Sequence, residues 1–238
     1  MFPYDPVIAA AVARTPQNIA DVFQIMRTID AVCIDADGLK WFNWLYMSVT
    51  EAIENQVASG GFHNAAWLSE LDVLFARLYF DALAGALTGG ACPECWKVMF
   101  AVRGQAPIAR IQFAMAGMNA HINHDLPMAV VSTCRATNTL PQHGTPQYAD
   151  YTAVNGTLDG LIDRAKQTLH VRLPGDPLPP VSHLEDMIAT WDLATFREQA
   201  WNTAQSLWGE SDDEIRLRMD LRSAIVATLS AALLVPVP

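Results

Sequence analysis

Hydrophobic residues recur along most of the chain at the three- and four-residue spacing of an amphipathic helix. Runs in which hydrophobic and polar residues alternate, as they do in strands, are almost absent. The pattern therefore predicts an all-α fold, a single-domain bundle of about seven to nine helices over residues 1–238. The clearest helix runs from Asn64 to Gly89, and its apolar face is formed by Trp67, Leu71, Leu74, Phe75, Leu78 and Leu83.

Proline, glycine and capping residues mark where these helices begin and end. Two helices are expected to begin at Ser182 and Ser211, because Glu185 and Glu214 complete capping boxes with them. The Pro-rich segment 174–181 is predicted to be a connector before the C-terminal helices. Thr15 is the expected cap of the first helix. The other predicted helices cover residues 16–33, 39–60, 64–89, 93–102 and 146–170, and a further one runs from 107 to at least 125.

The segment AGMNAHINHDLP, residues 116–127, places polar side chains in a helix that is otherwise apolar on nearly every face. A helix of that kind is normally buried. Burying a polar group without a partner costs about 2 kcal/mol or more, so these groups must bond to one another, to neighbouring helices or to a ligand. They are Asn119, His121, Asn123, His124 and Asp125.

Helical spacing divides these polar groups between two sides. His121 and Asp125 lie one turn apart on one side, whereas Asn119 and Asn123 fall on roughly the opposite side. All can face one pocket only if the helix unwinds. Pro127 gives a reason for unwinding, because its ring removes a hydrogen bond and leaves the carbonyl of Asn123 without its usual partner.

Three hypotheses fit the polar cluster. In the first, His121 is a general acid or base, and Asp125 or Asp72 sets its tautomer. In the second, metal ligands are drawn from His121, Asp125, Asp72 and His124. In the third, the polar side chains only tether a central helix to its neighbours.

Residues around the cluster suit an apolar substrate. Ala114 and Gly117, on the side of His121, leave room for a close helix or a bound molecule. Aromatic residues at the density found in 41–46 more often form core than pocket, but they also suit a hydrocarbon-rich ligand. The candidate substrate-binding residues are Tyr46, Trp41, Trp44, Tyr79, Asn119, Asn123 and Met118.

Composition narrows the class of protein. The formal charge of −10 argues against a nucleic-acid partner, which needs clustered Lys and Arg. No signal peptide or membrane span is expected, and four cysteines in 238 residues fit a reducing cytoplasm rather than a disulfide scaffold. Cys92 and Cys95 form a CxxC pair, but the βαβ context of a redox motif and the second pair of a zinc site are missing.

The block GMNAHINHDLP resembles an uncharacterised family of actinobacteria and filamentous fungi, a domain of unknown function. The segments WFNWLYMSVT (41–50) and WLSELDVLFARLYFDAL (67–83) share the resemblance, which covers residues 15–170. Cys92–Cys95 and His124 depart from the family's pattern. The resemblance implies a helical fold. Because fungal members sometimes sit among natural-product biosynthesis genes, it also favours a cyclase or isomerase, without naming a catalytic residue.

The leading hypothesis is a cofactor-independent cyclase or isomerase, of which a pericyclic enzyme is one form. It would act on a small, largely apolar natural-product intermediate in a helical pocket. One alternative is a metal-dependent hydrolase that uses the His/Asp cluster. The other is a non-catalytic small-molecule carrier or interaction protein. A homo-oligomer is compatible with all three.

Overall fold

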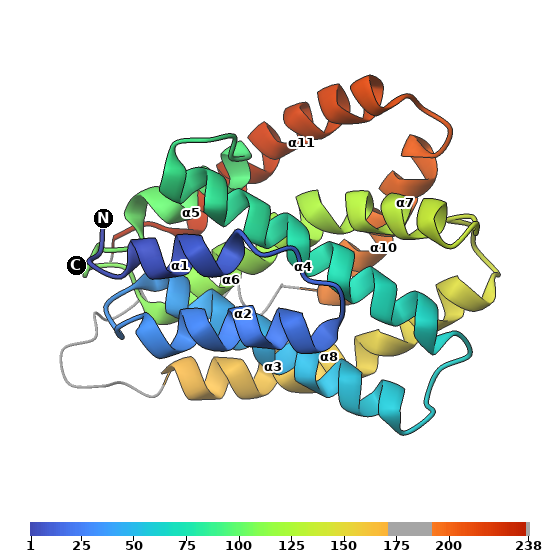
Figure 1. Cartoon of the computed structure of the whole chain (residues 1–238), viewed down its shortest axis with the longest axis horizontal. Coiled ribbons are helices and arrows are strands. Elements are labelled where there is room, and N and C mark those ends of the chain that lie inside the picture. The colour runs from blue at the N-terminus through green and yellow to red at the C-terminus, as the bar shows by residue number, and fades with distance from the viewer. Residues whose placement is uncertain (171–191, 237–238) are drawn as a thin grey trace.

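The computed structural model describes residues 1–170 and 192–236, with backbone only for 162–167 and 170, and every regular element in this part is helical (Figure 1). Because α6, η1 and α7 run on as one rod, the described part contains nine helical rods, which confirms the predicted all-α bundle. The elements are α1 (Asp5–Val12), α2 (Ile19–Val32), α3 (Gly38–Ala58), α4 (Ala65–Thr88), α5 (Glu94–Val102), α6 (Arg110–Ala120), the π-helix η1 (His121–Asp125), α7 (Leu126–Ala136), α8 (Pro146–His170), α10 (Leu193–Leu207) and α11 (Asp212–Leu233).

Most predicted helix boundaries agree with the structure to within two residues, but two predicted N-termini were wrong and one helix was missed. Helix α2 is capped by Asn18, whose side chain accepts from the amide of Asp21, and not by Thr15. Helix α6 begins at Arg110 rather than near 107, because Ala109 is extended and its amide donates to the Gln112 side chain. Helix α1 was not predicted at all.

The C-terminal helix starts as predicted. Ser211 and Glu214 form a capping box at the start of α11, with the Ser211 hydroxyl accepting from the Glu214 amide and the Glu214 carboxylate accepting from the Ser211 amide. The connector predicted at 174–181 and the helix expected to begin at Ser182 lie outside the described residues.

The rod formed by α6, η1 and α7 is the centre of the molecule (Figure 1). Helices α3 and α11 pack along α6, and α4 and α10 pack along α7. Every residue from Ile111 to Pro127 is buried, as the apolar character of this segment predicted. Two aromatic contacts hold α3 against α6. A Cβ at Gly117 would lie 2.3 Å from the ring of Phe42, and one at Gly38 would lie 2.3 Å from the ring of Phe113. The space beside Gly117 is therefore occupied by a close helix.

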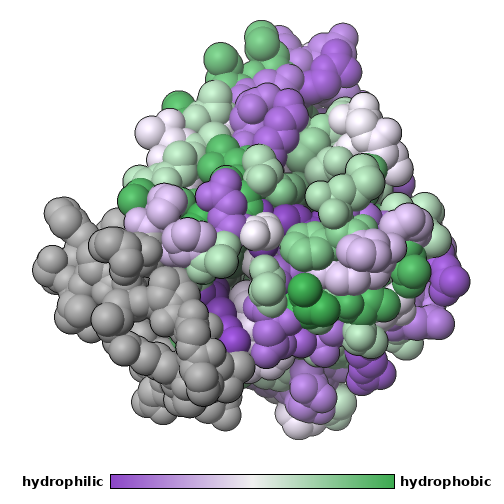
Figure 2. Space-filling model, turned by 90° about the vertical axis from the view of Figure 1, so that its left-hand side faces the viewer, coloured by the Kyte–Doolittle hydropathy of each residue, from purple (hydrophilic) through white to green (hydrophobic). Residues whose placement is uncertain are grey.

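The surface carries both polar and apolar residues. At the end of the molecule where the chain termini lie, the two kinds are interspersed (Figure 2). Helix α11 packs on α5 and α6, and its outward side exposes Leu217, Leu221 and Ile225. Among the helices of the described part, none is both long and apolar enough to cross a membrane.

Candidate active site

The central rod widens at the polar cluster. From His121 to Asp125 it forms a π-helix, in which the amide of Leu126 donates to the carbonyl of His121 five residues earlier. Pro127 cannot donate to the carbonyl of Asn123, and the Nε of Arg222 on α11 donates to that carbonyl instead. The local unwinding expected from Pro127 is therefore present, as a π-turn, a feature frequent at functional sites.

His121 and Asp125 form a buried dyad within this turn. The His121 Nδ1 lies 2.8 Å from Asp125 Oδ2, and both side chains are 1% exposed. The His121 ring stacks on Phe75 of α4, with 3.5 Å between ring centroids and 5° between ring planes. Trp96 Nε1 donates to the same Asp125 oxygen at 2.9 Å. Asp125, rather than Asp72, therefore orients the imidazole of His121.

A second imidazole binds the other oxygen of Asp125. His124 Nδ1 lies 2.7 Å from Asp125 Oδ1. Burial lowers the pKa of His124, but interactions with Asp125 and with the neighbouring Cys95 outweigh burial and raise this pKa to about 10. At neutral pH His124 is therefore a cation that balances the Asp125 carboxylate. Cys95, the second cysteine of the CxxC segment, thus lies next to the site.

The two members of the dyad are held in different charge states. Burial lowers the pKa of His121, and it outweighs the opposing influence of Asp125. Burial would raise the pKa of Asp125, but hydrogen bonds from His121 and His124 outweigh it and lower this pKa. The stable arrangement is a neutral His121 whose Nδ1 hydrogen is donated to an ionised Asp125. The lone pair is then on Nε2.

A small cavity of about 40 Å³ lies beside the His121 ring, and apolar side chains of α3, α4, α6, η1 and α8 form most of its wall. Within the described part of the chain, no group hydrogen-bonds to His121 Nε2 or to the hydroxyl of Tyr46, although both residues line the cavity and are almost fully buried. A volume of this size holds a few water-sized groups. The polar side chains at its wall belong to Tyr46, Asp72, His121 and Arg197.

Asp72 lines the same cavity from α4. Burial raises the pKa of its carboxyl to about 7, against the opposing charge of Arg197. The half-buried Asp72 is therefore largely protonated in mildly acidic solution. It contributes a hydrogen-bond donor to the cavity wall, where an ordinary aspartate would contribute a negative charge.

This pKa predicts a pH-dependent effect of the Asp72→Asn substitution. Between pH ~4, where an unfolded Asp loses its proton, and about 7, only the folded chain keeps the Asp72 proton. In the wild type, the stabilising contribution of the Asp72 carboxyl is therefore fully present below pH ~4 and is lost as the pH rises to about 7. The free energy of unfolding of Asp72→Asn relative to wild type should therefore rise by about 1–2 kcal/mol across this window, a value that allows for partial exposure. Urea unfolding at several pH values measures it, with exposed Asp159→Asn as the control; equal pH profiles of wild type and Asp72→Asn would refute the assignment.

The other candidate residues lie in different places. Met118 lines the cavity, and Tyr79 packs edge-on against Phe42 within the core. The Nδ2 of Asn119 donates to the Val226 carbonyl and the Ser230 hydroxyl of α11, and Asn123 donates to Asn119. These two amides therefore tether the rod to α11. Trp41 and Trp44 are not in the cavity wall, and Trp41 Nε1 donates to the Asp35 carbonyl.

Three residues of the site were not identified from the sequence. Trp96 lies 29 positions along the chain from Asp125, and Arg222 lies 99 positions from Asn123, the residues to which they donate. Arg197 shares the cavity wall with Asp72, which lies 125 positions earlier in the chain. Their positions depend on how α5, α10 and α11 pack on the central rod. The one sequence signal was the carbonyl released by Pro127, which required a donor but did not name it.

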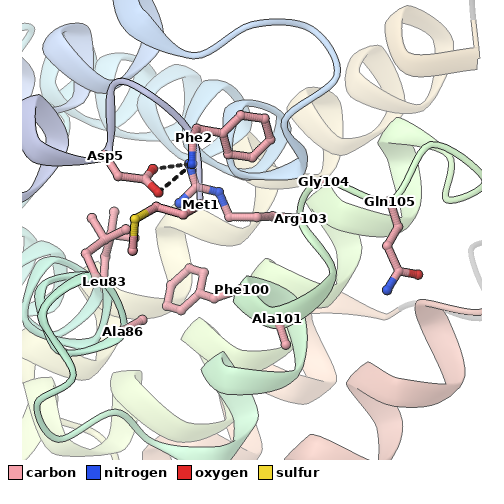
Figure 3. A pocket seen from close by; sticks show the side chains of 11 residues that line it. Met1, Phe2, Asp5, Leu83, Ala86, Phe100, Ala101, Arg103, Gly104 and Gln105 are labelled. Carbon is pink, nitrogen blue, oxygen red and sulfur yellow. Dashed lines mark hydrogen bonds and ion pairs between the residues drawn. The ribbon is translucent and has the colours of Figure 1, made fainter.

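A larger cavity, of about 530 Å³, lies near the N-terminus (Figure 3). Met1, Phe2, Leu83 and Phe100 form part of its wall, together with Asp5 and Arg103. The charged groups here already have partners, because the Arg103 guanidinium lies 3.0 Å from Asp5. We therefore place the candidate site at His121, where His121 Nε2 and the Tyr46 hydroxyl have no hydrogen-bond partner among the described residues.

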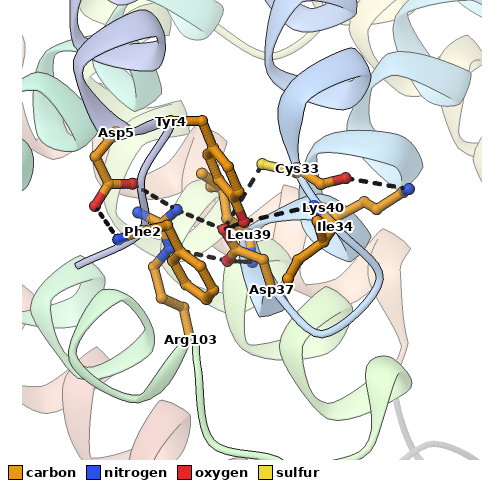
Figure 4. Close-up of polar contacts among 9 residues, drawn as sticks. All are labelled: Phe2, Tyr4, Asp5, Cys33, Ile34, Asp37, Leu39, Lys40 and Arg103. Atoms are coloured by element: carbon orange, nitrogen blue, oxygen red, sulfur yellow. Dashed lines mark hydrogen bonds and ion pairs between the residues drawn. The ribbon is translucent and has the colours of Figure 1, made fainter.

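The Arg103 guanidinium is part of a buried charged cluster that joins the N-terminal segment, α3 and the end of α5 (Figure 4). Arg103 donates to both oxygens of Asp37, at 2.8 and 2.5 Å. Asp37 also caps α3 by accepting from the Leu39 amide, and it accepts from the Tyr4 hydroxyl. Each charged group of the cluster is paired with an opposite charge, which assigns the cluster a structural role.

Comparisons with known proteins identify the family. No curated protein and no solved structure matches the chain. One family model, described as a family of unknown function (DUF5995), matches residues 19–236. The match extends the resemblance seen in 15–170 through the C-terminal helices, and only the segment with α1 lies before it. The chain therefore belongs to the DUF5995 family of proteins of unknown function.

Proposed function

We propose that this protein is an enzyme in which His121 is a general base for the isomerisation or cyclisation of a small, largely apolar molecule. The observation that carries the proposal is the His121 ring itself. Its Nδ1 is fixed by Asp125, while its Nε2 is buried at an apolar cavity without a partner in the described part of the chain. Leaving such an atom unbonded is costly unless a ligand meets it.

The neighbouring groups support proton transfer. His121 Nε2 takes a proton from a substrate carbon, and Asp125 stabilises the imidazolium that forms. Burial keeps the pKa of Tyr46 well above its usual value, so its hydroxyl remains a donor. This hydroxyl stabilises the negative charge that develops on a substrate oxygen. Return of the same proton to another carbon completes an isomerisation, with no net change in atoms or electrons.

The cavity limits the substrate. Its walls favour an apolar molecule, and its volume of about 40 Å³ accepts only a small one unless side chains move. Holding the reacting carbon against Nε2 in this space would itself contribute to the rate, because the reactive geometry is imposed on binding.

A metal-dependent hydrolase has less support. Each oxygen of Asp125 is hydrogen-bonded to one Nδ1 atom, Oδ2 to that of His121 and Oδ1 to that of His124. This cluster therefore offers the cavity only one free nitrogen, His121 Nε2. Over residues 1–170 and 192–236, no group of three His, Cys, Asp or Glu side chains is arranged to hold a metal ion. A carrier would need no base, and the substitution below separates it from an enzyme.

His121→Gln should reduce catalysed proton exchange by 10²-fold or more, since general base catalysis contributes about 10²–10⁴-fold. The assay incubates the protein in D₂O with a panel of short ketones and carboxylic acids and follows deuterium incorporation at carbon by NMR. His63→Gln, at an exposed histidine, is the matched control. Equal exchange by folded His121→Gln and wild type, or no exchange with any compound, would refute the proposal.

A further inference from the structure

Arg197 is a buried cation at the wall of the same cavity. It is 7% exposed, and its guanidinium is held in place by neutral groups. Nε donates to the side chain of Asn155 and Nη2 to the carbonyl of Tyr151, both at 2.7 Å. The guanidinium carbon also lies 4.1 Å from the centre of the Tyr151 ring. Arg197 is therefore rigid before any ligand binds.

Nothing in the described residues neutralises this charge directly, because none of their carboxylates forms an ion pair with Arg197. Asp72 is the carboxyl group that shares the cavity wall, and it is largely protonated below pH 7. The other polar groups there, His121 and Tyr46, are neutral at this pH. The cavity thus combines one positive charge with mostly apolar walls. Burying a cation without a counter-charge is costly, so the site favours an anionic ligand.

We infer that the cavity binds a small carboxylate, with its charged group on Arg197 and its apolar part against Phe75 and the His121 ring. A planar carboxylate matches the guanidinium in geometry and matches a single cation in charge. A phosphate dianion would be larger and would require a second positive charge. The inference rests on the proposed function in one respect: a carboxylate bound to Arg197 places its carbon skeleton next to His121 Nε2, the proposed base.

Binding of simple probes tests the inference without an activity assay. Acetate, propanoate and butanoate are compared with the neutral amides of the same shape at pH 6 by calorimetry. Wild type should bind the best carboxylate at least about tenfold more tightly than its amide. Arg197→Met, which keeps the apolar stem and removes the charge, should lose this preference. Arg77→Met, at an exposed arginine of α4, should keep it.

Two further variants, Arg197→Lys and His121→Gln, test the charge of Arg197 and the base separately. If Arg197→Met fails to fold, Arg197→Lys keeps the charge without the fork and should bind carboxylates several-fold more weakly than wild type. His121→Gln should still bind carboxylates more tightly than amides. If it does so but no longer catalyses proton exchange, the result supports carboxylate binding by Arg197 and assigns the base to His121. Equal affinity for acids and amides, no binding of any probe, or a preference unchanged in Arg197→Met would overturn it.

Discussion

Replacing Asp125 with Ala should destabilise the protein by about 3–5 kcal/mol. The carboxylate is 1% exposed and accepts from His121, His124 and Trp96. Its removal leaves the His124 cation buried and strands two further donors. Urea unfolding, followed by circular dichroism, measures the loss.

Asp81→Ala is the control for this prediction. Asp81 forms an exposed pair with Arg77 one helical turn away, at 3.7 Å, and its removal should cost less than about 1 kcal/mol. A double-mutant cycle of Asp125→Asn with His124→Gln tests the cause, because a charge-based explanation requires a coupling energy above about 1 kcal/mol. A loss below about 1 kcal/mol in Asp125→Ala would show that the carboxylate is not the centre of the network.

Asp37→Ala should cost a similar amount, about 3–5 kcal/mol, for a different reason. Asp37 is fully buried, and its two oxygens hold the Arg103 guanidinium and cap α3. Without it Arg103 keeps Asp5 as its one counter-charge among residues 1–170 and 192–236, and the first turn of α3 loses its cap. Thermal and urea unfolding should both show the loss.

Asp35→Ala provides a matched control two residues away. Asp35 pairs with Lys40 at 2.8 Å, but the carboxylate is 52% exposed, so the expected cost is at most about 1 kcal/mol. Similar losses of stability in Asp35→Ala and Asp37→Ala would mean that burial does not determine how much the Asp37 cluster stabilises the protein.

The fold was largely predictable because its signals are local. The apolar spacing of 64–89 and the capping box at Ser211 depend on residues within a few turns of one another, and both appear in the structure. Helix α1 was missed because it is only eight residues long, beginning at Asp5, and is mostly apolar without a distinct polar face. Its position depends on Asp5 and Tyr4 reaching Arg103 and Asp37, contacts that span long stretches of chain.

The candidate site was predictable only in part. The polar residues of 119–125 were identified because they interrupt a buried apolar helix, and the release of the Asn123 carbonyl followed from Pro127. The sequence could not show which neighbour satisfies each group. Asp125 rather than Asp72 holds His121, and Arg222 supplies the missing donor. Arg197 gave no local signal, since its importance comes from lining a cavity formed by distant helices.

The shared carboxylate explains how His121 and His124 have different charge states. Asp125 binds His124 through one oxygen and His121 through the other. The charge of His124 balances Asp125, which lets His121 stay neutral beside an ionised group. A base that is neutral, oriented and shielded from water is suited to proton transfer from carbon.

The protonation state of His121 tests directly whether its Nε2 atom can act as the base. Long-range proton–nitrogen NMR of the imidazole rings at pH 7, assigned with His121→Gln and His124→Gln, reports it for each histidine. We expect His121 to be neutral with its hydrogen on Nδ1 and a bare Nε2, and His124 to be charged. A charged His121, or one with its hydrogen on Nε2, would contradict the proposal that Nε2 is the base.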